Sequence, residues 1–583
     1  MKRPAMVGWY DPPRLIAIAI RVAISTIFGE FADRRESLAT ARAIEPDAID
    51  PAYDYSAQAE HEDFWLDFAA DTGDGWNPTY AMARLLAEPS LEVCGCREAL
   101  PRGRLLVLGG DEVYPTASRE DYQRKVVAPF DEAARGKIHG THVPHLYAIP
   151  GNHDWYDGLL AFLGLFCRRR KADAWAQARP GRGFGGRVTQ QTRSYFALKL
   201  PRGWWLWGAD VQLAGYIDQP QIDFFLHVAL NWMEPGSRLI LCTGQPSWTY
   251  VDPHNPDPQF KNFSYLESLV YQAQRQHRLC VVLAGDSHHY SRYVEGECNY
   301  LTAGGGGAFL HPTHQLQEKK FLWDYPAPGS PWIHGQTKYA REFQFARGAD
   351  GRPAIFPNQR TSQWLACRNA AFAVKNPQYA VVMGCFWAVF AWLLHAQAAY
   401  LGSSLIASLA PEALPPFSHT VLTYLSLVFL SPWPSALVLL TIAWYYFLAD
   451  YPPPWRLFIG VLHGSVHAIV AMLAICLLAR FMAGASSLSL IIATGIAGGA
   501  LSATMLGIYF LLSLNLFGRH WNEAFSALRI EDYKCFLRLR VGLDGTLHIF
   551  PIGLNRVPRE PRTGPLRKAK MHPHLIEQPV QVH

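Results

Sequence analysis

The sequence predicts an α/β layered domain, a β-sandwich with helices, followed by an α-helical transmembrane domain and a small C-terminal β-hairpin. Three observations predict this order. Residues 60–310 alternate short β-branched or aromatic runs with longer helical patterns. Residues 379–517 carry four charged residues in 139 positions, whereas the other 97 charged residues are spread over 444 positions. Residues 535–541 and 546–552 alternate in polarity around an Asp-Gly turn.

The overall composition supports two unlike parts and excludes several classes of protein. The 583 residues are 50% hydrophobic and 17% charged, against about 25% charged in an ordinary soluble domain. A disordered chain, a coiled coil and a wholly soluble protein are therefore excluded. The net charge of +5 comes without a Lys/Arg block, so we expect no nucleic-acid partner. The ten cysteines are scattered and form no secreted disulfide framework.

Residues 1–59 are expected to form an interfacial helix and a lead-in. The apolar run 15–28 is interrupted by Arg21 and is too short to span a bilayer. No small-residue cleavage site follows it cleanly, so we do not expect a signal peptide. A helix lying in the membrane interface is the better interpretation, with the soluble part of the chain in the cytosol.

Residues 60–310 contain five apolar runs that each end in a polar cluster. The runs are residues 65–70, 105–108, 146–149, 239–242 and 279–283, and the clusters begin at Asp71, Gly109, Pro150, Thr243 and Ala284. In open sheets the ligand site lies beyond the carboxyl ends of the strands. We therefore expect the five clusters to meet in space and to form the functional site.

The remaining elements follow in order. Residues 311–377 are rich in Pro, Gly and aromatic residues, which predicts an irregular connector. The transmembrane domain, residues 378–517, has apolar runs near 379–402, 417–430, 435–449, 457–479 and 487–517. Two runs are short and the last is long, so four, five or six spans are open. Residues 518–583 form a cytosolic tail that contains the hairpin.

The polar clusters contain the side chains that metal-assisted phosphate ester hydrolysis needs. Two divalent metals about 4 Å apart can neutralise the substrate, generate a nucleophile and stabilise the leaving oxygen. Asp111 is the natural bridging carboxylate, because Gly110 permits a sharp turn off the strand. Asp71 and His288 can complete one metal site, while Asn152 offers an amide oxygen to the other.

These clusters resemble those of the calcineurin-like metallophosphoesterases, in the spacing style of the purple acid phosphatases. The resemblance covers about residues 60–310 and rests on four motifs in order. They are Asp71-Thr72-Gly73, Gly110-Asp111-Glu112-Val113-Tyr114, Gly151-Asn152-His153-Asp154 and Gly285-Asp286-Ser287-His288. Each motif follows an apolar run, and the resemblance implies a binuclear metal-dependent phosphoesterase fold and activity.

The resemblance also implies a role for each matched residue. Asp71, Asp111 and His288 would hold the first metal, and Tyr114 would join them if the purple-acid-phosphatase pattern applies. Asp111 and Asn152 would hold the second metal. His153, supported by Asp154, would contact the phosphate and protonate the leaving oxygen.

Two positions depart from the family pattern, and both belong to the second metal. Gly244-Gln245 stands where the family usually has a histidine, and Asp286 stands in place of the first histidine of G-H-x-H. The second ligand set becomes Asp111, Asn152, Asp286 and Gln245. This oxygen-rich set favours Mn²⁺ or Mg²⁺ over Zn²⁺ or iron. The alternative is a weak or empty second site.

Other residues near the motifs have structural and functional interpretations. Asp74 is either a third carboxylate ligand or part of an Asp-Gly turn. His289 packs or orients a ligand, while His311 and His314 either line the same pocket or lie on a surface loop. The glycine run 304–307 permits close approach of the backbone to a phosphate, or forms a flexible hairpin tip.

The transmembrane domain carries a few polar features. His463 and His467 are four residues apart, which suits either a helix-packing hydrogen bond or a metal site, and we favour packing. Gly495 and Gly499 predict close helix packing. His520 either meets the catalytic pocket or caps the last helix.

Taken together, the sequence predicts an integral protein of the cytoplasmic membrane with a cytosol-facing phosphoesterase domain. Its partners would be the membrane and a phosphorylated small molecule or lipid, with two divalent metals as cofactors. One alternative is a degenerate phosphatase scaffold that senses a phosphorylated ligand, and another is a transporter regulated by its soluble domain. Lys and Arg flank the apolar region on both sides, at positions such as Arg368 and Arg519. We therefore expect both flanks in the cytosol and an even number of spans.

Overall fold

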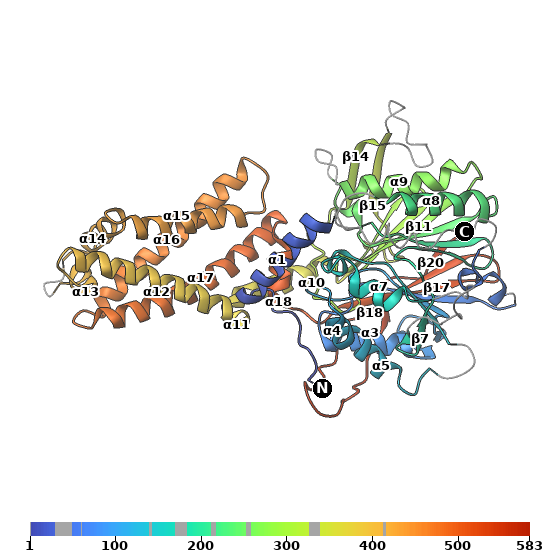
Figure 1. The fold of residues 1–583 in the computed structure, drawn as a ribbon, viewed down its shortest axis with the longest axis horizontal. Coiled ribbons are helices and arrows are strands. Elements are labelled where there is room, and N and C mark those ends of the chain that lie inside the picture. Colours follow the sequence, from blue (N-terminus) through green and yellow to red (C-terminus); the bar gives the residue numbers. More distant parts are fainter. Residues whose placement is uncertain are drawn as a thin grey trace. The chain divides into compact units, whose positions relative to one another are not determined.

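The chain forms two compact units in a computed structural model (Figure 1). The structure describes residues 2–29, 49–59, 61–138, 143–169, 183–211, 217–251, 258–325, 339–411 and 415–583. The β-sheet unit comprises Met1–Val7, Ala17–Ser362 and Arg529–His583. The helical unit comprises Gly8–Ile16 and Gln363–Leu528. Helix α1, Pro12–Gly29, confirms the helix predicted for residues 15–28, and part of the lead-in lies outside the described residues.

The first sheet of the β-sheet unit carries three of the five predicted strand ends side by side. Among the described residues it has nine strands, in the order β19-β18-β17-β1-β4-β5-β7-β6, with β20 also paired to β18. Strands β1 (Phe64–Ala69), β4 (Leu105–Leu108) and β5 (His145–Ala148) run parallel to one another, and each is an apolar run of the predicted kind. Their carboxyl ends therefore lie along one edge. The other strands are β6 (Gly183–Phe184), β7 (Arg187–Thr189), β17 (Lys534–Val541), β18 (Leu547–Leu554), β19 (His574–Leu575) and β20 (Val580–Val582).

The second sheet carries the remaining strand ends. Its nine described strands follow the order β14-β15-β12-β13-β11-β10-β9-β8, with β16 paired to β12. Strands β10 (Arg238–Thr243) and β11 (Arg278–Ala284) are parallel neighbours. The others are β8 (Phe196–Lys199), β9 (Trp204–Gly208), β12 (Tyr290–Glu295), β13 (Cys298–Ala303), β14 (Lys319–Tyr325), β15 (Tyr339–Phe345) and β16 (Ile355–Phe356).

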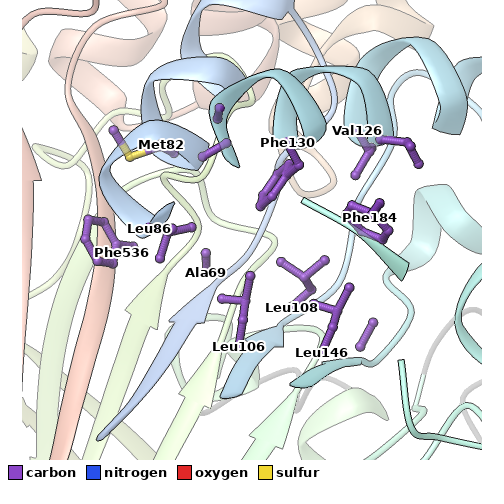
Figure 2. Close-up of a cluster of buried hydrophobic side chains, with 14 of the residues drawn as sticks. Ala69, Met82, Leu86, Leu106, Leu108, Val126, Phe130, Leu146, Phe184 and Phe536 are labelled. Atoms are coloured by element: carbon purple, nitrogen blue, oxygen red, sulfur yellow. The ribbon is translucent and has the colours of Figure 1, made fainter. Parts of the chain in front are cut away.

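Three apolar cores hold the two sheets and their helices together. One core lies between the sheets and includes Phe68, Val107 and Leu283. A second packs the first sheet against α3 (Trp76–Ala87) and α5 (Ala128–Ala134), and Figure 2 shows its side chains converging from strands and helices. The third packs the second sheet against α8 (Gln219–His227) and α9 (Pro258–Gln272). The unit is thus a β-sandwich between helical layers, as the sequence predicts.

Two predicted boundaries differ from the structure. The predicted connector, residues 311–377, is not irregular throughout, because β14 and β15 extend the second sheet. The predicted hairpin is present as β17 and β18, but it is not separate from the phosphoesterase region. Strand β17 pairs antiparallel with β1, with Phe64 opposite Val541 and Phe68 opposite Leu537. Segments more than 460 residues apart therefore share one sheet.

The helical unit provides three helices that are long and apolar enough to cross a membrane, within the described part of the chain. They are α12 (Pro377–Tyr400), α16 (Trp455–Phe481) and α17 (Ser487–Phe517). The pair α14 (Phe417–Phe429) and α15 (Pro432–Leu448) is bent by 95° and makes a fourth candidate if it counts as one span. Five or six spans exceed this count, because α14 and α15 are each too short to cross alone. Four shorter helices complete the unit: α10 (Gln359–Ala366), α11 (Phe372–Lys375), α13 (Leu405–Leu409) and α18 (Trp521–Leu528).

Small residues allow the helices of this unit to approach closely. A Cβ added at Gly499 would lie 2.2 Å from the carbonyl oxygen of Ala380, so α12 and α17 touch through their backbones there. The predicted close packing is confirmed. His467 Nδ1 lies 3.3 Å from the hydroxyl of Tyr445 on α15, which agrees with the packing interpretation, and its Nε2 lies 3.2 Å from Nε2 of His463 on the same helix. His520 Nε2 accepts hydrogen bonds from Tyr509 and from the backbone of Asp450 inside the same unit.

A candidate metal centre at the strand ends

Three aspartates leave their strands in the left-handed backbone region. Asp71 follows β1 with φ 60°, Asp111 follows β4 with φ 53°, and Asp286 follows β11 with φ 64°. Asp is one of the few non-glycine residues that adopt this conformation, which turns the chain sharply. Such strained positions gather at functional sites.

Tyr114 joins the residues predicted for the first metal. Its hydroxyl donates to Asp71 Oδ1 at 2.6 Å and lies 3.3 Å from Asp111 Oδ2 and 2.9 Å from His288 Nε2. His288 Nε2 also lies 3.4 Å from Asp71 Oδ1. The fold therefore brings together all four predicted first-site residues around one hydroxyl oxygen. Three of them come from three different strand ends, and Tyr114 comes from the loop after β4.

The His288 ring is held with one nitrogen toward this cluster. Its Nδ1–H donates to the carbonyl of Phe309 at 2.7 Å, so in the neutral ring Nε2 carries the lone pair. His311 stacks on His288 with ring centroids 3.8 Å apart, and its Nδ1 accepts the backbone N–H of His288 at 3.1 Å. His311 thus packs against a predicted metal ligand and hydrogen-bonds to its backbone, as neighbouring groups do at metal sites.

Comparison with known families identifies the domain. The family model of the calcineurin-like phosphoesterases matches residues 64–290. Residues 64–290 are a calcineurin-like phosphoesterase domain. The match includes β1, β4, β5, β10 and β11 with the loops that follow them.

Among solved structures, the chain is similar to GAP50, described as the anchor in the inner membrane complex of Plasmodium. The identity is 11% and the TM-score 0.30, over 43% of this chain and 74% of that one. It is also similar to the purple acid phosphatase PPD1 from yellow lupin (Lupinus luteus) seeds. That identity is 12% and the TM-score 0.28, over 44% of this chain and 46% of that one. No curated protein matches the chain.

Asn152 and His153 of the phosphoesterase domain follow β5 on a short helix, α6 (Asn152–Trp155). Asn152 Oδ1 is buried and accepts no hydrogen bond from the described residues. A buried amide oxygen without a donor is costly unless a cation or water completes it. His153 donates its Nδ1–H to the carbonyl of Pro115 at 2.7 Å, which leaves Nε2 as the unprotonated nitrogen of the neutral ring. Burial lowers the pKa of His153 to about 4.

Asp154 differs from its predicted role as the support of His153. Its Oδ2 accepts the backbone N–H groups of Gly151 at 2.9 Å and Glu112 at 3.3 Å, and its Oδ1 accepts the hydroxyl of Tyr122. The His153 ring is oriented by the carbonyl of Pro115 instead. Asp154 therefore ties the loop after β5 to the loop after β4, because it is the third residue of α6 and faces that helix's own N-terminus.

The residues predicted for the second metal are less closely joined. Asp286 donates its backbone N–H to Asp71 Oδ2 at 2.9 Å, and its carboxylate accepts the hydroxyl of Tyr250 at 2.9 Å. The described hydrogen bonds of Gln245 involve its carbonyl, which accepts from Ser247 and Thr243. Its side chain role stays a prediction. No sequence pattern singles out Tyr250, because it lies in no motif.

The other pocket candidates have structural roles in the phosphoesterase domain. Asp74 is fully buried and accepts the backbone N–H groups of Val7 and Phe309, so its carboxylate ties the loop after β1 to two remote segments. His289 is buried, and neither ring nitrogen meets a hydrogen-bonding group of the described chain. Burial lowers the pKa of His289 to about 3. His314 bonds to Ser362 at 2.8 Å.

The glycine run 304–307 is buried against the loop that carries Asp71, and it is not a flexible hairpin tip. Gly306 N–H donates to the carbonyl of Ala70, and a Cβ added at Gly307 would lie 2.0 Å from the carbonyl oxygen of Thr72. A Cβ added at Gly304 would lie 2.6 Å from Asp71 Oδ2. Glycine is required here because the run packs against backbone and ligand atoms.

Buried carboxyl groups dominate the electrostatics of the centre. Burial raises the pKa of Asp71 and Asp111 well above the usual range, and repulsion from neighbouring aspartates adds to the increase. Burial likewise raises the pKa of Glu112, with Asp154 beside it. Burial is also the main cause of the low pKa of His288. Grouped acids beside neutral imidazoles are costly without a cation.

The donor set fits divalent metals in its chemistry. In the part of the chain that the structure describes, no three His, Cys, Asp or Glu side chains are already spaced as ligands of one ion. Two carboxylates, an imidazole and a phenol nevertheless meet at Tyr114, and the buried oxygen of Asn152 has no donor. Replacing the shared proton of Tyr114 by a cation would relieve the repulsion between the acids.

Proposed function

We propose that the chain is a membrane-anchored, metal-dependent phosphoesterase that hydrolyses a phosphate ester or a pyrophosphate. One observation carries this proposal: Asp71, Asp111, Tyr114 and His288 meet within hydrogen-bonding distance at the strand ends of a calcineurin-like phosphoesterase domain. The helices that are long and apolar enough to cross a membrane support the anchoring.

In this proposal each residue of the centre has a defined task. Asp71, Asp111, His288 and Tyr114 would hold the first metal, and Asp111, Asn152, Asp286 and Gln245 the second. The metals would lower the pKa of water and neutralise the phosphate. His153, with its Nδ1–H held by the carbonyl of Pro115, would present an unprotonated Nε2 to the substrate, take up a proton there from water, and pass it to the leaving oxygen. Asp154 would hold the loop after β4 and the loop after β5 together.

The ligand chemistry favours unequal metal sites. The first set contains an imidazole nitrogen, whereas the second contains only oxygen donors. We therefore propose that the second site binds its ion more weakly and prefers Mn²⁺ or Mg²⁺ to Zn²⁺. Purified protein should carry less than one equivalent of second metal and gain activity when Mn²⁺ is added. Two tightly held zinc ions per chain, without a response to Mn²⁺, would contradict this.

We further propose that the substrate is a lipid phosphate or a lipid-linked phosphate, cleaved on the cytosolic side of the cytoplasmic membrane. A single span would suffice to anchor a soluble enzyme, but this chain devotes residues 377–517 to helices. A membrane domain of this size suits a substrate that partitions into the bilayer.

The test uses the full chain in mixed micelles. Metal is removed with EDTA and restored as Mn²⁺, Mg²⁺ or Zn²⁺, and hydrolysis of a lipid phosphate and of a soluble chromogenic ester is compared. Asp111→Asn is the inactive control. We expect Mn²⁺-dependent hydrolysis in the wild type, loss in Asp111→Asn, and a clear preference for the lipid. Equal rates on both substrates would show that the helices serve only to anchor the enzyme and do not select a lipid substrate.

A degenerate scaffold that binds a phosphorylated ligand without cleaving it is the second candidate. The observation in its favour is that Asp286 replaces a family histidine and that its carboxylate is held by the Tyr250 hydroxyl. If this function is the right one, the chain binds a lipid phosphate under every metal condition but releases no phosphate.

A further inference from the structure

A second pocket of the β-sheet unit lies beside the N-terminal segment. It has a volume of about 610 Å³ and is lined by four basic residues and one acidic residue. The basic residues are Lys2, Arg3, Arg135 and Lys568, and the acid is Glu132. Glu132 pairs with Arg135 at 2.9 Å, so the lining keeps a clear excess of positive charge. Such a lining attracts anions.

The wall of this pocket also offers an apolar face and a hydrogen-bond donor. Trp76, Leu566 and two prolines line it together with the basic residues. Trp76 is only 8% exposed. Its indole Nε1 is buried and has no hydrogen-bond acceptor among the described residues. Buried N–H groups normally have an acceptor, so one is missing here. An anionic oxygen would supply it.

The pocket is lined by four separate segments of the chain, and several of them are bonded to one another. Arg3 donates to the carbonyl oxygens of Pro561 and Gly564, and its guanidinium lies 5.6 Å from the centre of the Trp76 ring. Buried Glu560 accepts the backbone N–H groups of Arg567 and Lys568. The basic side chains therefore project from an ordered frame, which lowers the entropic cost of binding.

We infer that this pocket binds a phosphate-bearing anion, the group shared by an anionic lipid headgroup and free phosphate. The basic residues and the Trp76 N–H would contact the phosphate oxygens. The apolar face favours the headgroup of a lipid over the free ion, because it can cover the glycerol and the first carbons of the chains. The site is distinct from the proposed catalytic centre and needs no metal.

The pocket borders the loop that carries Asp71. Trp76 begins α3 directly after residues 71–75, and its backbone N–H donates to the carbonyl of Pro4 at 3.1 Å. Val7 N–H donates to Asp74 in the same loop at 2.8 Å. The N-terminal segment thus contacts both the pocket and the loop.

The test measures binding by titration calorimetry with the full chain in phosphatidylcholine nanodiscs. EDTA is present throughout, so the catalytic centre holds no metal. The probes are dihexanoyl phosphatidic acid, inorganic phosphate and dihexanoyl phosphatidylcholine, each corrected with empty nanodiscs. We expect phosphatidic acid to bind more tightly than inorganic phosphate, and phosphatidylcholine to add no heat.

Two variants and a matched control locate the site. The triple variant Lys2→Gln, Arg135→Gln, Lys568→Gln should weaken binding of phosphatidic acid by at least about tenfold. Trp76→Phe keeps an aromatic ring at the wall but removes the indole N–H, and should weaken binding by about fivefold or more. The control Arg124→Gln, Lys319→Gln, Arg347→Gln removes the same charge from exposed ion pairs elsewhere and should leave binding unchanged.

Each remaining outcome decides against part or all of the inference. Unchanged binding in the triple variant would overturn the site, and so would an equal loss in the control. Equal affinity for phosphatidic acid and inorganic phosphate would overturn the lipid preference. Because EDTA removes the catalytic contribution, these outcomes do not depend on whether the chain hydrolyses phosphate esters.

Discussion

At the scale of single residues, the hydroxyl of Tyr114 is the common contact of the candidate metal centre. It touches two carboxylates and one imidazole from three strand ends. A phenol in this position can serve as a ligand itself or orient the ligands around it. Both roles place its oxygen beside the first metal.

Tyr114→Phe should lower the affinity for the first metal by about 10–100-fold. The aromatic ring keeps its packing, so activity should return when excess Mn²⁺ is supplied. Mn²⁺ titration of activity and metal content by mass spectrometry measure the effect. Tyr293→Phe, which removes a hydroxyl that donates to Gln317 in the second sheet, is the matched control. An unchanged Mn²⁺ dependence in Tyr114→Phe would exclude the tyrosine from the site.

Lys534 predicts a specific dependence of stability on pH. It is fully buried at the start of β17, its ammonium has no hydrogen-bond partner in the described chain, and burial lowers its pKa from 10.5 to about 8. Between these values the unfolded chain keeps a proton that the folded chain releases. Stability is therefore lost as the pH falls from 10.5 through 8, and the full penalty remains below pH 8.

Lys534→Met should therefore raise the stability at pH 7 by roughly 3 kcal/mol and much less at pH 10. The unfolding temperature of the variant and the wild type at the two pH values measures the difference. Lys319→Met, an exposed lysine of β14, should show no such pH dependence. A Lys534→Met variant that is destabilised equally at both pH values would show that the ammonium has a partner.

At the scale of elements, the glycine run 304–307 fixes the position of the loop after β1. Gly307→Ala should destabilise the β-sheet unit by about 1–3 kcal/mol, because the new Cβ would meet the carbonyl of Thr72. It should also weaken Mn²⁺ binding, since Asp71 lies in that loop. Thermal unfolding and Mn²⁺ titration give the two effects.

Gly164→Ala is the matched control for this substitution. Gly164 lies inside α7, Leu160–Phe166, and a Cβ there would be 3.7 Å from Arg168. Alanine favours a helix by about 0.5–1 kcal/mol over glycine. The control should therefore be neutral or slightly stabilising. If both substitutions behaved alike, the close packing of the run would not matter.

The sequence predicts the strand ends well and the long-range contacts poorly. Strands β1, β4, β5, β10 and β11 are short apolar runs with polar ends, and this local pattern is enough to place their clusters at one site. The pairing of β17 with β1 depends on residues far apart, and no local pattern encodes it. Asp154 illustrates the same limit at a single position, because its partner Tyr122 lies in another element.

At the scale of the whole molecule, the β-sheet unit contains chain from both sides of the helical region. Residues 17–362 precede the helices and residues 529–583 follow them, yet β1 and β17 share one sheet. The chain must therefore return to the side from which it left. This connectivity predicts an even number of membrane crossings rather than the three that α12, α16 and α17 alone would make.

We therefore expect four spans, with α14 and α15 crossing as one bent span. The loops at residues 401–404 and 482–486 should lie on one side of the membrane, and residues 450–454 on the other side, together with the two flanks of the helical region. The flanking basic residues predict that this second side is cytosolic. Single cysteines at Ser403, Pro453 and Ala485, in a chain whose exposed native cysteines are replaced, can be labelled from each side. Labelling of Ala485→Cys from the cytosol would contradict this topology.

A chain that ends at Leu528 should lose the phosphoesterase domain as well as the tail. It lacks strands β17–β20 of the first sheet, which leaves one side of β1 unpaired and opens two cores. We expect aggregation and no metal-dependent hydrolysis, measured by gel filtration and activity. A short tag added after His583 removes no strand and should preserve both. A soluble, active chain ending at Leu528 would show that β17 is dispensable.

The pairing of β1 with β17 also sets an order of events during synthesis. Strand β1 ends at Ala69 and β17 begins at Lys534, so at about 5–20 residues per second the ribosome needs roughly 20–90 s between them. During that interval the apolar helices leave the ribosome, and the edge of β1 that will pair with β17 stays unpaired. The first sheet can therefore be completed only after the apolar helices between residues 377 and 517 have been synthesised, and one edge of β1 stays exposed until then.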